Sequence, residues 1–98
     1  MEVAQLPQIE TLQTGRLFKI LRVIGEQGIQ MPLHHSTGEA ILIGQRGSAV
    51  LYMDGKEYEV ARGSSIIIPS RMPHSLNIIQ DFHALVIMDN NSIIEFEK

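Results

Sequence analysis

Turn-forming residues recur at short and fairly even intervals along this chain, and this recurrence constrains its fold more than any other feature. Short runs rich in Ile, Val, Leu and Tyr separate them, and no window of about a dozen residues carries a helical apolar stripe. Such spacing is typical of an all-β sandwich or barrel built from short strands. The turn signals are Gly25, Gly28, Gly38, Gly44 to Gly47, Asp54-Gly55, Gly63, Pro69, Pro73 and Asp89-Asn90-Asn91.

The clearest local unit is a β-hairpin over residues 49–60. Asp54-Gly55 lies between two strand-like runs, and both residues of such a turn tolerate positive φ. The returning run alternates in character, because Val60 and Tyr58 share one face while Glu57 and Glu59 share the other. One face of this strand is therefore expected to meet solvent.

Other strands are expected over residues 63–69, 82–88 and 93–96. An N-terminal strand segment is expected at about residues 15–25, where Leu17 to Ile24 form an apolar run that period alone does not assign to helix or strand. Its β-branched residues and the following Gly25 favour a strand.

Size and charge exclude several classes of protein. The 98 residues are expected to form one domain over 1–98. A net charge of −3 with scattered basic residues argues against nucleic acid as a partner. With no cysteine, thiolate sites and disulfides are absent. No run approaches the roughly 20 apolar residues of a membrane helix, and no signal peptide is evident, so we expect a cytoplasmic protein with no membrane contact.

Two segments place glycine and histidine at fixed offsets: Gly28 with His34 and Gly47, and Gly63 with Pro69 and His74. In these residues the chain resembles the cupin superfamily. The first family motif is a glycine, five residues, a histidine, one residue, a second histidine, three or four residues, a glutamate, six residues and a glycine. Gly28, His34 and Gly47 fit this register. The register places Ser36 at the second histidine and Ala40 at the glutamate.

The second motif is a glycine, five residues, a proline, a glycine two positions on and a histidine three positions later. Gly63, Pro69 and His74 fit, and Arg71 stands in place of the second glycine. The resemblance covers about residues 28–88. Within the superfamily, the chain resembles the small single-domain cupins. This resemblance implies a small antiparallel β-barrel, or jelly roll, whose site lies inside the barrel.

In the cupin family, three histidines and a glutamate hold one divalent metal ion, and such a donor set suits Zn, Ni, Mn or Fe. The resemblance carries this role to His34 and His74, which we favour as ligands. His35 and Glu39 lie one residue from the missing ligands, and regular strands would turn them away from the cavity. A bulge near Gly38 would re-aim Glu39. Two imidazoles alone hold a metal weakly.

Four further residues are candidates for lining a ligand pocket. Ser36 and Ala40 occupy the two vacated ligand positions of the resemblance. Arg71 is placed to meet an anionic group with its planar guanidinium, although an exposed turn arginine is the simpler interpretation. His83 would add a third nitrogen if its side chain faced inward, but the parity of its strand cannot be read from the sequence.

Three functions remain open at this stage, and whether the protein is an enzyme is one of the open points. The first is small-molecule binding in the barrel cavity, with a partial or absent metal site. The second is a metal-dependent enzyme, of dioxygenase or isomerase type, that uses His34, His74 and a third ligand. The third is a regulatory domain that acts through a partner chain. We also expect a homodimer, with Leu17 to Ile24 as the candidate interface or exchanged edge.

Overall fold

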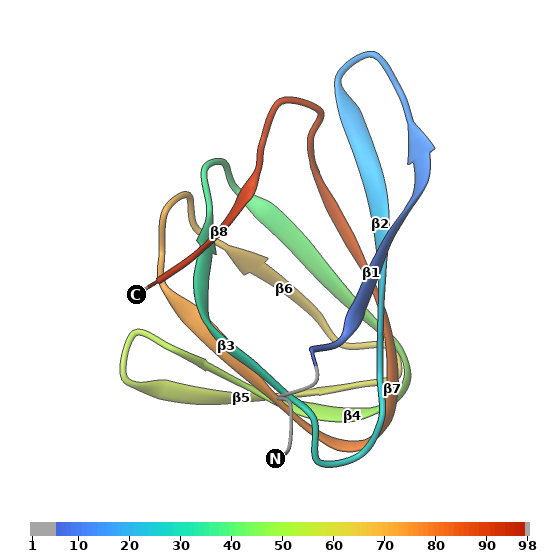
Figure 1. Cartoon of the computed structure of the whole chain (residues 1–98), viewed down its shortest axis with the longest axis vertical. Helices are drawn as coiled ribbons and strands as arrows, with labels where there is room; N and C mark the ends of the chain where they lie inside the picture. The colour runs from blue at the N-terminus through green and yellow to red at the C-terminus, as the bar shows by residue number, and fades with distance from the viewer. Residues whose placement is uncertain (1–5, 98) are drawn as a thin grey trace, which may run out of the picture.

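The computed structural model describes residues 6–97, which form eight β-strands joined by turns and contain no helix (Figure 1). The predicted all-β fold is therefore confirmed. No helix among these residues is long and apolar enough to cross a membrane. The strands are β1 (Gln8–Thr14), β2 (Phe18–Gly25), β3 (Gln30–Ser36), β4 (Ala40–Met53), β5 (Lys56–Ala61), β6 (Ser65–Ile68), β7 (His74–Asp89) and β8 (Ile94–Phe96).

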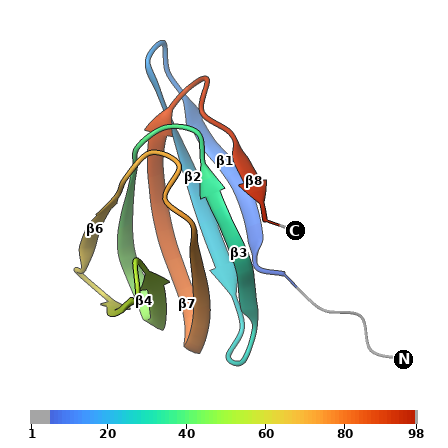
Figure 2. The same cartoon turned by 90° about the vertical axis from the view of Figure 1, so that its left-hand side faces the viewer.

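All eight strands belong to one antiparallel sheet that curls over on itself (Figure 2). The long strands β4 and β7 pair with each other along most of their length and are shared by both halves of the curl. One half has the order β1-β2-β7-β4-β6, and the other has β8-β3-β7-β4-β5. The result is a half-barrel of the jelly-roll type, with its apolar residues between the two halves.

The curl is made by a corner in β4 where glycines bring two backbones together. A Cβ at Gly44 would lie 2.0 Å from the carbonyl oxygen of Ala61, and one at Gly47 would lie 1.8 Å from that of Asp81. Gly47 also has a φ of 74°, which favours glycine. The pairing register with β7 shifts along this stretch. Gly44 to Gly47, expected as a turn, instead form bulges within one continuous strand.

The predicted hairpin is confirmed in detail. Asp54 and Gly55 have φ values of 53° and 72°, as a two-residue turn of the primed type requires. Met53 then pairs with Lys56. Val60 is fully buried, whereas Glu57 and Glu59 are exposed, so the alternation seen in the sequence places one face of β5 in the core.

The other expected strands are present with changed limits. Residues 63–69 contain β6, residues 93–96 contain β8, and Leu17 to Ile24 coincide with β2. The late strand begins at His74 rather than Phe82. The polar segment β1 was not anticipated. Because β2 pairs with β1 on one side and β7 on the other, the sheet edge expected at Leu17 to Ile24 belongs to β1 instead.

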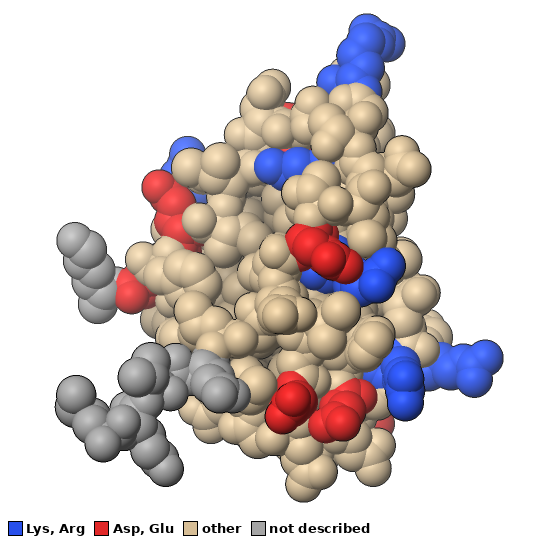
Figure 3. Space-filling model, turned by 45° about the vertical axis from the view of Figure 1, so that its right-hand side comes forward, with Lys and Arg blue, Asp and Glu red and all other residues tan. Residues whose placement is uncertain are grey.

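The core lies between the halves of the curl, next to the corner. Its largest fully buried side chains are Phe82, Leu51, Ile78 and Val60. Charged side chains lie on the outside, where the face seen in Figure 3 carries basic and acidic groups scattered among uncharged ones. Several residues of this core, Leu51 among them, also line the pocket described next.

Candidate functional site

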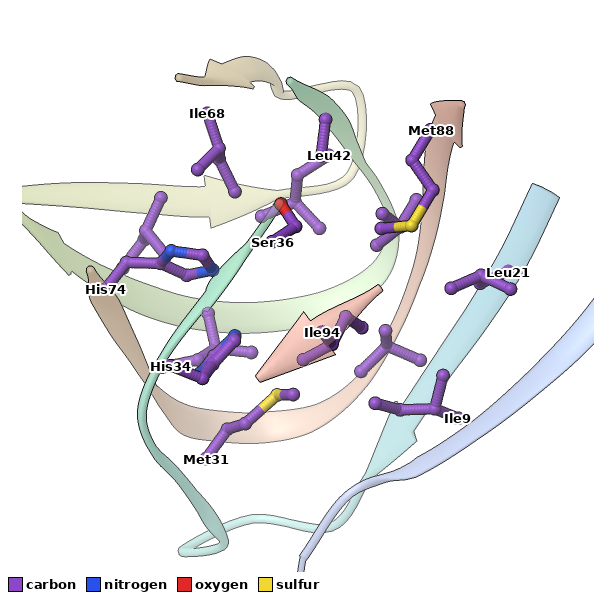
Figure 4. A pocket seen from close by; sticks show the side chains of 15 residues that line it. Ile9, Leu21, Met31, His34, Ser36, Leu42, Ile68, His74, Met88 and Ile94 are labelled. Carbon is purple, nitrogen blue, oxygen red and sulfur yellow. The ribbon is translucent and has the colours of Figure 1, made fainter. Parts of the chain in front are cut away.

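A small apolar pocket lies between the two halves of the sheet (Figure 4). Its volume is about 50 Å³. Since a water molecule needs about 10–15 Å³ in this measure, the pocket holds only a few water-sized groups. Ligand sites for whole drug-sized molecules measure about 300–1,000 Å³. The lining residues are Ile9, Leu21, Val23, Met31, His34, Ser36, Ala40, Leu42, Leu51, Ile68, His74, Leu76, Val86, Met88 and Ile94.

An irregularity in β3 decides which of its side chains enter the pocket. Pairing with β7 shifts register between Met31 and His34, and the two intervening residues, Pro32 and Leu33, are both exposed. Met31 and His34 therefore both face inward although their spacing is odd. After this bulge the strand alternates regularly, which turns Ser36 inward and His35 outward.

His34 and His74 meet inside the pocket as cross-strand neighbours. Their Cα atoms are paired between β3 and β7, and such neighbours present their side chains on the same face. The ring centroids are 4.1 Å apart with an interplanar angle of 63°. Both residues are buried, with 5% and 6% of their surface exposed. Two imidazoles far apart in sequence thus form one edge-to-face pair.

Each ring is oriented by a hydrogen bond to the backbone two residues earlier. His34 Nδ1 lies 2.7 Å from the carbonyl oxygen of Pro32, and His74 Nδ1 lies 2.9 Å from that of Met72. Because a carbonyl oxygen only accepts, each Nδ1 must carry the hydrogen. In the neutral rings, each Nε2 is then a hydrogen-bond acceptor, and no hydrogen bond within residues 6–97 occupies either one.

The surroundings keep both rings uncharged near neutral pH. Burial lowers the pKa of His34 to about 4, and neighbouring His74 adds to this effect, while the bond to Pro32 opposes it. Burial likewise lowers the pKa of His74 against the opposing bond to Met72. The apolar lining disfavours the imidazolium form of each ring, so both Nε2 lone pairs remain free.

Ser36 contributes the one side-chain oxygen among the described residues that line the pocket. Its Oγ donates to the carbonyl oxygen of Gly38 at 3.0 Å, so toward the pocket this oxygen is an acceptor. Its own carbonyl accepts a 2.9 Å hydrogen bond from the backbone N–H of Arg71. Arg71 has a φ of 62°, which is the left-handed conformation that glycine adopts most easily.

The candidate residues from the sequence separate into two groups in the structure. His34, His74, Ser36 and Ala40 all line the pocket. The others do not, and this corrects the expectation that they share it. Glu39 is exposed in the turn between β3 and β4. His83 lies between the fully buried Phe82 and Ala84, and strand alternation turns it to the opposite face.

Arg71 and His35 also lie away from the pocket. The Arg71 side chain is exposed. In the turn it is the Arg71 backbone that makes the contact, through its N–H hydrogen bond to the Ser36 carbonyl. His35 forms ion pairs on the outer face with Glu95 and Glu97, and these carboxylates raise its pKa, Glu97 having the larger effect. His35 thus links β3 to the C-terminal residues.

Sequence reasoning missed the contribution of the last strand. Ile94 of β8 pairs with Ser36 and lines the pocket. Phe96 pairs with His34, and the two rings are 5.4 Å apart at 43°. The apolar alternation of Ile94 and Phe96 around Glu95 is a sequence signal for one inward-facing side of this strand. It does not reveal the strand to which β8 pairs.

Comparison with known proteins identifies the family. The sequence pattern of the family described as the cupin domain matches residues 21–88. The chain belongs to the cupin family. This confirms the resemblance carried by the two motifs, and the match includes both pocket histidines. None of the curated proteins matches the sequence.

Several solved structures resemble this fold over most of its length. An RmlC-like cupin protein from Desulfovibrio desulfuricans is 23% identical, with a TM-score of 0.77 over 87% of this chain and 83% of its own. A conserved protein of unknown function from Streptococcus pyogenes is 25% identical, with a TM-score of 0.74 over 99% and 79%. A mutant salicylate 1,2-dioxygenase from Pseudoaminobacter salicylatoxidans is 12% identical, with a TM-score of 0.82 over 93% of this chain and 30% of the enzyme.

The donors in this cupin's pocket do not complete the metal site that the family resemblance implies. Metal sites in proteins use at least three protein ligands as a rule, and His34 and His74 supply two. His35, Glu39 and His83 lie elsewhere, and residues 6–97 contain no group of three or more His, Cys, Asp or Glu side chains placed to hold a metal ion. Ser36 adds only a neutral hydroxyl, which is a poor substitute for the missing imidazole or carboxylate.

Proposed function

We propose that this cupin binds a small molecule directly through His34 and His74, and that the pocket recognises a compact head group rather than a whole large ligand. The observation that supports the proposal is the pair of backbone-anchored imidazoles whose Nε2 atoms are left free in an apolar pocket. Pockets with apolar walls and a few fixed polar groups are the usual form of a small-molecule site.

The size of the pocket fits the head-group interpretation. About 50 Å³ admits a few heavy atoms, so the remainder of a larger ligand would extend through the open side of the half-barrel. Met31 and Met88 line the pocket, and their unbranched side chains adapt to occupants more easily than β-branched ones. Modest rearrangement of these two side chains would enlarge the site without moving the strands.

A binding experiment on the whole chain tests the proposal. Protein labelled with ¹³C at the methionine methyl groups is titrated with a mixture of small amides, alcohols and carboxylates. We expect saturable shifts at Met31 and Met88 and none at Met53, which is buried in the core outside the lining. Ala40→Leu places a larger side chain in the pocket and should abolish the shifts while both imidazoles remain. Absence of saturable shifts in the unmodified protein would overturn the proposal.

Metal analysis separates this proposal from the metal-dependent enzyme that was the second hypothesis. We expect the purified protein to retain no stoichiometric Zn, Ni, Mn or Fe after dialysis, because two neutral nitrogens bind such ions weakly. The His34→Ala, His74→Ala double variant is the control. A stoichiometric metal that is retained by the unmodified protein and lost in the double variant would favour the enzyme hypothesis instead.

A further inference from the structure

Every side-chain polar atom that lines the pocket is an acceptor toward its interior. The Nδ1 hydrogens of His34 and His74 are used by backbone carbonyls, and the Ser36 hydroxyl hydrogen is used by Gly38. The sulfur atoms of Met31 and Met88 are weak acceptors. No lysine, arginine, aspartate or glutamate lines the pocket. The pocket therefore offers several lone pairs but no hydrogen and no charge.

Such an arrangement selects among ligands by their hydrogen-bonding groups. A carbonyl, ether or carboxylate oxygen has no hydrogen to donate and would face the lone pairs of His34 and His74, leaving those acceptors unsatisfied. A carboxylate would in addition bury its charge with no cation beside it. An ammonium group has hydrogens to donate, but its positive charge would also be buried with no opposite charge beside it. An uncharged NH₂ group brings two hydrogens on one atom without a charge.

On the basis of the proposed function, we infer that the ligand's head group is an uncharged NH₂ group, as in a primary carboxamide. One N–H bond would be donated to each Nε2, since the two ring centroids lie only 4.1 Å apart. The carbonyl of the amide would point to the open side, where water satisfies it. The short apolar part of the head group would contact Met31, Met88 and Ile94.

Three probes of nearly the same planar shape test this inference. Acetamide carries two N–H donors, acetone carries none, and acetate carries none and is charged. Titration of the methionine-labelled protein is expected to give the tightest binding for acetamide, with acetone weaker by about thirtyfold, since two hydrogen bonds of ordinary net strength are lost. Acetate is expected to give no saturable shift at Met31 or Met88.

Matched variants on the same strand complete the test. His74→Leu removes one acceptor and should weaken acetamide binding by at least about fivefold. His83→Leu, also on β7 but outside the pocket, should leave it unchanged. If the His74 variant does not fold, His34→Leu removes the other Nε2 acceptor and should weaken acetamide binding by a similar factor.

The outcomes distinguish this inference from the function on which it rests. Equal affinity for acetamide and acetone, or tighter binding of acetate, would overturn the inference while small-molecule binding in the pocket stands. If none of the probes, and no member of the broader mixture, shifts Met31 or Met88, then the inference and the proposed function both fail. Tightest binding of acetamide, lost in the His74 variant only, supports both.

Discussion

Acid should destabilise this protein through its buried histidines, and His34 gives the clearest magnitude. Its pKa falls from 6.5 to about 4 on folding. Between these values the unfolded chain binds a proton that the folded chain does not, so stability is complete above pH 6.5 and declines as the pH falls. One pKa unit corresponds to 1.36 kcal/mol. The full loss from His34 is therefore about 3 kcal/mol, of which about 2 kcal/mol is already lost at pH 5.

Urea unfolding at a series of pH values measures this effect. Comparison with His34→Gln isolates the contribution of one ring, because other groups titrate in both proteins. We expect the unmodified protein to lose about 2 kcal/mol more than the variant between pH 7.5 and pH 5, which shifts the urea midpoint by about 1 M. Parallel pH profiles for the His34 variant and the unmodified protein would refute the argument.

Three further predictions concern the corner in β4, the ion pairs of His35 and the oligomeric state. Gly47→Ala should cost about 2 kcal/mol more than Gly55→Ala in urea unfolding, because both have positive φ but only Gly47 meets backbone, the Asp81 carbonyl; equal losses would refute the close-contact argument. His35→Ala should lower the urea midpoint at pH 6 but not at pH 9, because the raised pKa makes this stabilisation available at low pH and removes it as the pH rises through that value; a loss independent of pH would contradict the ion-pair role. We expect a dimer in analytical ultracentrifugation at micromolar concentration and a monomer for Phe18→Glu, since this side chain is 59% exposed at the start of β2; a monomeric unmodified protein would end this expectation.

The fold was largely predictable because its signals are local. Asp54-Gly55 specifies a hairpin through two φ values, and Gly28, Pro69 and His74 match family positions at fixed offsets. Glycine in the corner was misread for a physical reason. A glycine that permits a turn also permits close approach of two backbones, and only the contact of Gly47 with Asp81 distinguishes the two.

The site was less predictable because one bulge in β3 decides which side chains of that strand face the pocket. The bulge at Pro32 and Leu33 sets which residues of β3 face inward. A proline inside a strand favours a bulge, but it does not show which of the following side chains turn inward. His34 and Ser36 were assigned through the family register rather than through strand alternation. For His83 no such register was available, and its direction became clear only from the burial of its neighbours.

The full length of β7 was not predicted from the sequence, for a related reason. Ile79, Gln80 and Asp81 are all exposed in the middle of β7, so the apolar pattern breaks where the strand passes the corner. A reader of the sequence sees the apolar run resume at Phe82 and places the start of a strand there. The continuous strand is required by its pairing with β4 on both sides of the corner.

The pocket depends on both imidazole rings holding their hydrogen on Nδ1 and leaving Nε2 as a free acceptor. A long-range ¹H–¹⁵N correlation spectrum of the imidazoles at pH 7 measures this directly. We predict that His34 and His74 both show a protonated Nδ1 and an unprotonated Nε2. A hydrogen on Nε2 in either ring, as the other neutral tautomer or as an imidazolium, would mean that the pocket offers a donor and that binding of an NH₂ group through both rings is wrong.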